Sequence, residues 1–198
     1  MRRRRPNPGR PRNPIPRKRM RSAGPLLPPR ARHDLQRAHR LQENGDHKNA
    51  ALIFSRLAEM AFNRSRLRQA PMLFLQAAQS FALEGQSEQA ISHGRRGLEL
   101  LVETQRWVML QQAGQRVIDT LAEIGQDQPA QELQDWLDNT LANLPTVKPP
   151  PTTSRRATAK LPLKCPSCGA TVRPDEANWY DRTRAECAYC GSTLEASN

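Results

Sequence analysis

The chain has 198 residues, of which 31 are lysine or arginine and 19 are aspartate or glutamate, so its formal net charge is +12. This length allows one ordinary domain with appendages. No apolar run approaches the roughly 20 residues of a membrane-spanning helix, and the charged N-terminus lacks the apolar centre of a signal peptide. We therefore expect a cytoplasmic protein with no membrane partner.

The charge is concentrated at the N-terminus. Residues 1–33 hold twelve basic side chains and no acidic one, which leaves 19 of each kind for residues 34–198. Residues 1–32 also contain eight prolines and little apolar bulk, so nothing offsets the entropy lost on ordering. This composition predicts a disordered tail over residues 1–32.

Such a tail would bind the phosphates of RNA or DNA without sequence preference. The candidate contacts are Arg2, Arg3, Arg4 and Arg5. Two alternatives stand beside this hypothesis: a solvated extension without a partner, and a translation start at Met20 that would remove residues 1–19.

Residues 33–144 are predicted to form a helical domain. Apolar residues recur there at three-to-four spacing, as on the buried face of a helix. The stripes are Leu52, Ile53, Leu57 and Met60; Phe74, Leu75, Ala78, Phe81 and Ala82; Leu98, Leu101 and Val102; and Leu133, Trp136, Leu137 and Leu141.

The breaks between these stripes are periodic. Glycines at positions 45, 85 and 125 are each followed by an alanine, at positions 50, 90 and 130, so the pattern recurs at a constant interval. Glycine suits a left-handed helix end, and we expect Asp46, Ser87 and Asp127 to cap the helices that follow. The small alanine allows two helices to lie close together. The alternative is an irregular bundle in which the three glycine–alanine pairs align by chance.

The segment Gly45-Asp46…Ala50…Phe54…Ala58 resembles the turn and second helix of a tetratricopeptide repeat, and the breaks at Gly85 and Gly125 are similar. The period is longer than the roughly 34 residues of that family, and Gly94 stands where Phe54 does. The resemblance implies three helix-turn-helix units of an α-solenoid, a scaffold that holds peptides or protein surfaces on a concave face. Within the predicted helix of 88–104, Gly94 and Gly97 lie one turn apart, which indicates close approach of a neighbouring helix.

Residues 145–160 form a Pro/Thr-rich linker, and residues 161–198 contain all four cysteines. Cys165 and Cys168 form one C-x-x-C pair and Cys187 and Cys190 another, and each pair is followed directly by glycine. A two-residue gap lets one tight turn offer two thiolates to a single ion, and Zn²⁺ prefers four such ligands in a tetrahedron. Glycine can take the positive φ that these turns require.

This pattern resembles the zinc-ribbon family over residues 163–195, with the four cysteines at its ligand positions. Residues 161–198 contain few large apolar side chains, so a bound metal is needed to stabilise the fold. Four cysteines leave no open coordination position, so we expect one structural zinc ion; iron in a rubredoxin-like site is the alternative. A thioredoxin-like redox role is disfavoured because no βαβ pattern surrounds either pair.

Two aromatic and two basic residues of the ribbon are further candidates. Trp179 is expected to pack in the core, whereas Tyr180 is left between core packing and stacking on a base. Arg182 and Arg184 are candidate nucleic-acid contacts, although acidic residues are interleaved with them.

The fold class expected from the sequence is mainly α, with a small β zinc ribbon and a disordered tail. We find no phosphate loop, nucleophile motif or paired histidines, so neither enzyme activity nor a small-molecule substrate is expected. The favoured function is a non-enzymatic adaptor that binds protein partners of unknown identity. The alternative is a nucleic-acid-associated factor that uses the tail and the ribbon.

Overall fold

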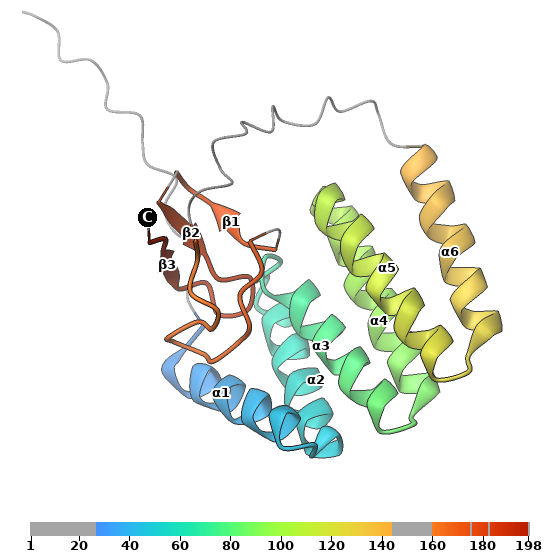
Figure 1. Ribbon diagram of the computed structural model, residues 1–198, viewed down its shortest axis with the longest axis horizontal. Helices are drawn as coiled ribbons and strands as arrows, with labels where there is room; N and C mark the ends of the chain where they lie inside the picture. Colours follow the sequence, from blue (N-terminus) through green and yellow to red (C-terminus); the bar gives the residue numbers. More distant parts are fainter. Residues whose placement is uncertain (1–26, 144–159, 175, 182, 198) are drawn as a thin grey trace, which may run out of the picture.

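The computed structural model describes residues 27–143, 160–174, 176–181 and 183–197. Over these residues it contains six helices and, after them, a small three-stranded sheet (Figure 1). This confirms the prediction of a mainly α fold with a small β region near the C-terminus. Nearly all of the predicted tail and linker lies outside the described residues. The elements are α1 (Pro29–Glu43), α2 (His47–Asn63), α3 (Ala70–Leu83), α4 (Ser87–Glu103), α5 (Trp107–Glu123), α6 (Asp127–Ala142), β1 (Asn178–Trp179), β2 (Arg184–Glu186) and β3 (Thr193–Glu195).

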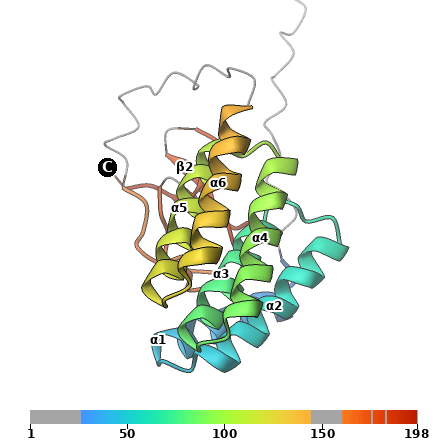
Figure 2. The ribbon, with the colours of Figure 1, turned by 90° about the vertical axis from the view of Figure 1, so that its right-hand side faces the viewer.

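The six helices form three antiparallel hairpins that follow one another from α1 to α6 (Figure 1). In the side view, α1, α3 and α5 lie in one layer, and α2 and α4 lie in a second layer beside it (Figure 2). We call the described residues of 160–197 the ribbon, and we call α1, α3 and α5 the inner layer. The ribbon lies on the side of the inner layer (Figure 2). No helix within the described ranges has the length and apolar character that crossing a membrane requires.

The three periodic glycines close the three hairpins. Gly45, Gly85 and Gly125 have φ of 81°, 76° and 74°. After each glycine, the next backbone N–H donates to the carbonyl oxygen five positions earlier, for example Asp46 to Leu41 at 2.9 Å. This is the hydrogen bond of a Schellman helix end, which favours glycine because only glycine adopts positive φ without strain.

The connections between hairpins use the same turn without glycine. Ser65 (φ 53°) joins α2 to α3, and Gln105 (φ 55°) joins α4 to α5. Arg66 N–H donates to Ala61 and Arg106 N–H to Leu101, at 2.8 and 2.9 Å. All five turns are therefore equivalent, and their left-handed residues are evenly spaced, at positions 45, 65, 85, 105 and 125.

The helix starts correct part of the capping prediction. Asp46 is the N-cap of α2, and its side chain accepts a hydrogen bond from Asn49 N at 3.2 Å. Ser87 and Asp127 instead lie inside α4 and α6 as the first helical residue, so the cap positions equivalent to Asp46 are Gln86 and Gln126. Neither glutamine side chain caps its helix.

The first helix begins before residue 33, the start expected for the helical domain. Pro28 is its N-cap and Pro29 its first residue, because proline fits a first turn in which its missing N–H would have no partner. Leu27 is 1% exposed, so the core also reaches into the predicted tail.

Small residues bring the helices together, as the sequence predicts. Ala50 and Ala90 are buried. A Cβ on Gly97 would lie 2.9 Å from Leu75 Cγ and 3.0 Å from the Pro71 carbonyl oxygen, so this glycine is needed for the close packing of α4 on α3. A Cβ on Gly94 would lie 3.2 Å from Val117 Cγ1 of α5.

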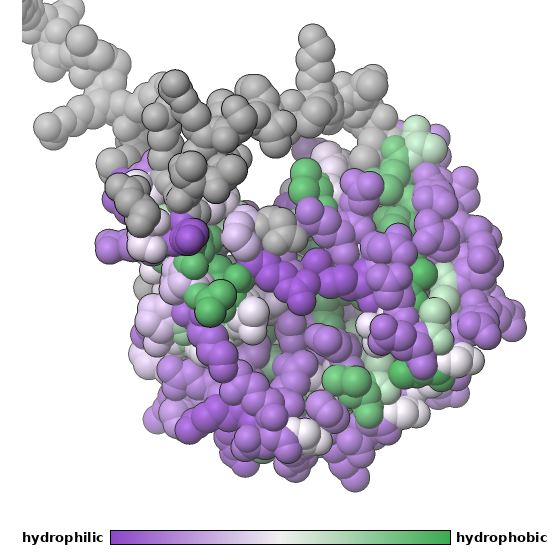
Figure 3. Space-filling view, in the orientation of Figure 1, coloured by the Kyte–Doolittle hydropathy of each residue, from purple (hydrophilic) through white to green (hydrophobic). Residues whose placement is uncertain are grey.

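The core is built around α3, in which 11 of the 14 residues are buried because α2, α4 and the ribbon surround it. The apolar stripe predicted for α2 is wrong at Leu52, which is 52% exposed, whereas Phe54 is completely buried. Hydrophilic residues cover most of the face seen in Figure 3, with hydrophobic residues visible in strips between helices and over the ribbon.

The sheet is antiparallel in the order β1-β2-β3. Ala185 in the middle strand pairs with Trp179 on one side and Leu194 on the other. Strands of two and three residues form few hydrogen bonds, so the sheet does little to stabilise the ribbon by itself.

Candidate metal centre

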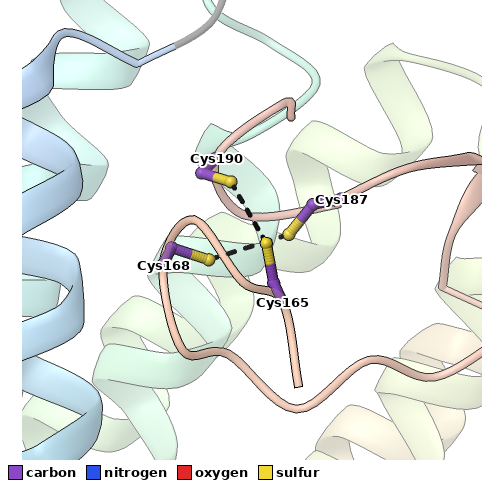
Figure 4. Close-up of side chains that lie close together, drawn as sticks. All are labelled: Cys165, Cys168, Cys187 and Cys190. Atoms are coloured by element: carbon purple, nitrogen blue, oxygen red, sulfur yellow. Dashed lines mark hydrogen bonds between the residues drawn. The ribbon is translucent and has the colours of Figure 1, made fainter. Parts of the chain in front are cut away.

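Four sulfur atoms converge in the ribbon. The Sγ atoms of Cys165, Cys168, Cys187 and Cys190 all lie within 4.8 Å of one another (Figure 4). Two of these separations, Cys165 to Cys190 and Cys168 to Cys187, are 3.7 and 3.8 Å. Thiolates at about 2.3 Å from a tetrahedral ion would lie about 3.8 Å apart. The four predicted ligands are therefore positioned to bind one metal ion.

Two similar turns deliver the sulfurs. Gly169 N–H donates to the Cys165 carbonyl oxygen at 2.8 Å, and Gly191 N–H donates to that of Cys187 at 3.0 Å. Both glycines have positive φ, 75° and 78°, as the sequence predicts. We call these turns the first knuckle (165–169) and the second knuckle (187–191).

All four thiols are free and no more than 2% exposed. Contacts among the sulfurs lower the pKa of Cys165, beginning with the contact to Cys168, and raise the pKa values of Cys168 and Cys187. The neighbouring thiols thus favour the thiolate at some of the four positions and oppose it at others, so the four cannot all ionise together without a cation. The burial and the ligand set fit a closed metal site.

Ser192 is a residue of this site that sequence reasoning missed. Its Oγ lies 2.9 Å from Cys190 Sγ and 3.3 Å from Cys165 Sγ, and the residue is 7% exposed. Beside thiolates the hydroxyl is the donor, so it stabilises one ligand from each knuckle. A serine two positions after a ligand gives no signal in the sequence, because its orientation depends on the fold of the turn.

The second knuckle is seated on the helical domain through Glu186. This residue precedes Cys187 and is completely buried. Its carboxylate accepts hydrogen bonds from Arg68 Nη1 at 2.7 Å, Tyr180 OH at 2.9 Å and Gln69 Nε2 at 3.4 Å. Arg68 and Gln69 belong to the turn before α3, so an ion pair joins the second knuckle to the inner layer.

A second buried carboxylate, Glu176, makes an equivalent contact with α5. Its Oε1 lies 2.6 Å from Arg116 Nη2, and its Oε2 accepts from Tyr189 OH at 3.3 Å. Tyr189 lies within the second knuckle and also accepts from Gln76 Nε2 of α3 at 3.2 Å. Burial raises the pKa of Tyr189, so the phenol stays neutral and its O–H donates a hydrogen bond to Glu176.

Helix α1 covers the knuckles from the other side. The His39 ring makes T-shaped contacts with the rings of Tyr189 and Phe54, with distances of 5.7 and 5.0 Å between the ring centroids. Burial lowers the pKa of His39 to about 4, so this imidazole is neutral at physiological pH. Gln36 Nε2 donates to the Ser167 carbonyl oxygen at 3.0 Å, and Leu27 N–H donates to that of Cys190 at 3.1 Å.

A pocket lies beside this junction, between α3, α5 and the ribbon. Its walls include Leu75, Ala78 and Val117, while Arg116 and Tyr189 are at its ribbon end. The ribbon therefore forms one wall of a pocket that is otherwise made by the helices.

The remaining candidate residues of the ribbon lie in different environments. Trp179 is half-buried rather than a core residue, and its indole N–H donates to the Pro174 carbonyl oxygen. Tyr180 binds Glu186. Arg184 makes two hydrogen bonds to Asp181 Oδ2, at 2.7 and 2.9 Å. Arg182 and the tail arginines Arg2, Arg3, Arg4 and Arg5 lie outside the described residues.

Comparison with protein-family models, curated proteins and solved structures finds no match to this chain. The assignment of the site therefore rests on its own geometry: a helical domain of three hairpins and a cluster of four cysteines able to bind a metal.

Proposed function

We propose that this protein is a non-enzymatic scaffold, stabilised by one zinc ion, that binds a protein partner. The observation that carries the proposal is the closed tetrathiolate site, whose knuckles are also the part of the ribbon that contacts the helices. A metal in this position holds the ribbon and the inner layer together, which is a structural role.

Zinc is the ion we propose for the site. Four thiolates that surround one position suit Zn²⁺, whose structural sites are almost always four-coordinate and tetrahedral. The same ligands accept iron, as in a rubredoxin-like site. Elemental analysis of the purified chain distinguishes the two: we expect about one zinc per chain and no visible iron–thiolate absorption. A chain without bound metal, with all four thiols alkylated in the native state, would contradict the proposal.

A tetratricopeptide-like assignment of the helical domain is part of the proposal. It is supported by three hairpins with equivalent left-handed turns and by the buried Ala50, Ala90 and Ala130 that follow these turns. Helical repeats of this kind present extended surfaces to other proteins. The partner can be sought by affinity capture with the full chain, metal-loaded and treated with nuclease. We expect a stoichiometric partner that survives nuclease treatment.

A nucleic-acid-associated role is the second candidate, and the observation that favours it is the twelve basic residues in 1–33. Binding to RNA and DNA should be compared across salt for residues 1–198 and 27–198. The shorter chain keeps Leu27 and all of α1, so the ribbon contacts remain. Binding by the long chain alone, with a steep salt dependence, would place the role in the tail. No binding at low salt would eliminate it.

Both candidates are proposed to act in the cytoplasm. Four free cysteines in a metal-binding arrangement suit a reducing compartment, where thiols are not oxidised to disulfides.

A further inference from the structure

The surface that the ribbon covers on the helices is polar and specific. It consists of residues from α1, from α5, and from α3 with the turn before it: Gln36, His39, Arg68, Gln69, Gln76 and Arg116. Two arginines on this surface each pair with a buried ribbon carboxylate, Glu186 or Glu176. We call it the ribbon-facing surface.

The ribbon residues that bind this surface are held in place mainly by the knuckles. Ser167 lies between the two cysteines of the first knuckle, and Tyr189 lies between those of the second. Glu186 directly precedes Cys187, and the Cys190 carbonyl oxygen accepts from Leu27 N–H. The positions of these groups depend on the turns that the metal closes.

The rest of the described part of the ribbon is too weakly bonded to hold these turns. Its strands are very short, and so small a segment with so few large apolar side chains needs a metal to fold. Without the ion, opening the knuckles increases the conformational entropy of the chain. This gain competes with the contacts that Glu186 and Tyr189 make with the helices.

The helices, in contrast, keep a core of their own. Phe54, Leu73, Leu98 and Leu101 are completely buried. The ribbon-facing surface carries charged and amide side chains that water can solvate once the ribbon leaves. Ion pairs to a buried carboxylate, such as Arg68–Glu186, add specificity more than net stability, so separation at this surface leaves the helical domain folded.

We propose that the ribbon-facing surface is a docking surface for an acidic, aromatic segment, and that the metal-loaded second knuckle is its occupant in this chain. The metal acts as the latch: removing it releases the ribbon and exposes the surface and the pocket between α3 and α5. This inference rests on the proposed metal binding, but it adds that the metal controls access to the inner layer.

The test uses the full chain in three states: metal-loaded, stripped with a chelator, and reloaded with Zn²⁺. Hydroxyl-radical footprinting reports the exposure of His39 on α1, with Trp136 on α6 as a control far from the knuckles. We expect His39 reactivity to rise about tenfold on stripping and to return on reloading, with Trp136 unchanged. Amide exchange of residues 27–43 should rise with it, because Leu27 N–H loses its acceptor.

A variant separates docking from metal binding. Arg68→Met with Arg116→Met removes both cations from the helical side and leaves every cysteine in place. It should keep its zinc and yet show raised His39 reactivity, whereas the control Arg56→Met with Arg95→Met, both exposed on α2 and α4, should behave like the native chain.

Two outcomes would contradict the proposal that the metal holds the ribbon on the ribbon-facing surface. If stripping leaves His39 protected while residues 160–197 become exposed, ribbon folding and docking are independent. If Trp136 becomes reactive together with His39, the metal supports the whole fold rather than one surface. A native chain that never contained metal would instead refute the proposed function itself, so the two failures are distinguishable.

Discussion

Glu186 is completely buried beside Cys187 and lies 2.7 Å from the guanidinium of Arg68, which is far away in the sequence, in the turn before α3. A buried carboxylate is strongly destabilising unless it is paired with a cation and hydrogen-bonded. Here the carboxylate has both a guanidinium partner and further hydrogen-bond donors. The ion pair therefore fixes where the second knuckle meets the helices.

The first prediction concerns this pair. Arg68→Met should lower the free energy of unfolding of the metal-loaded chain by about 1–3 kcal/mol, because the buried carboxylate loses its charged donor. In a Glu186→Gln background the same change should cost about 1 kcal/mol less, because a neutral amide needs a cation less. Urea unfolding of the four chains measures this coupling. Arg64→Met, an exposed change in the same turn, is the control; additive effects would show that the pair is not coupled.

The second prediction concerns the serine between the two knuckles. Ser192→Ala removes the hydroxyl that lies near Cys165 and Cys190, so the affinity for zinc should fall about 10- to 100-fold. Competition with a chromogenic chelator measures the change. Thr193→Ala alters the exposed neighbouring residue and should leave the affinity within about twofold of the native value. An unchanged affinity in Ser192→Ala would mean that the hydroxyl does not support the thiolates.

The helical hairpins and the four ligands could be predicted from the sequence because their signals are local. Gly45, Gly85 and Gly125 mark turns that need positive φ, and two C-x-x-C pairs show the ligands directly. The docking of the ribbon could not be predicted. A glutamate next to a cysteine looks like a solvated side chain, and its partner Arg68 lies in a turn that carries no glycine.

The lack of glycine in that turn also explains why the sequence does not show the even spacing of all five turns. Ser65 and Gln105 adopt the same left-handed conformation as the glycines, so two of the five equivalent turns have no sequence signal. Their conformation is imposed by the packing of the helices on either side. Trp179 shows the opposite error, since an aromatic residue suggests a core position that the short strand β1 does not provide.

The third prediction follows from these strained turns. Ser65→Gly and Gln105→Gly should each raise the free energy of unfolding by about 0.5–1 kcal/mol, because relief of the left-handed strain exceeds the added entropy of the unfolded chain. Arg64→Gly is the matched control: Arg64 has φ of −96°, so glycine there should destabilise. Denaturant unfolding compares the three variants. Destabilisation by glycine at 65 and 105 would contradict the equivalence of the five turns.

The fourth prediction contrasts two helical glycines. A Cβ at Gly97 would lie 3.0 Å from the Pro71 carbonyl oxygen, which belongs to the backbone of α3 and cannot turn aside. A Cβ at Gly114 would lie 2.7 Å from Leu137 Cδ2, the flexible end of a side chain that can rotate away. Alanine should therefore destabilise the fold by about 1–3 kcal/mol at Gly97 and by less than about 1 kcal/mol at Gly114.

Thermal and denaturant unfolding of Gly97→Ala and Gly114→Ala, with exposed Arg95→Ala of α4 as the control, measures the contrast. Alanine favours a helix over glycine by about 1 kcal/mol, which offsets part of the steric cost wherever the neighbour can move. A Gly97→Ala chain as stable as the native one would show that α3 and α4 can separate slightly without loss. The close contact between these two helices would then be adjustable, and the backbone of α3 would not be the rigid support on which the ribbon is seated.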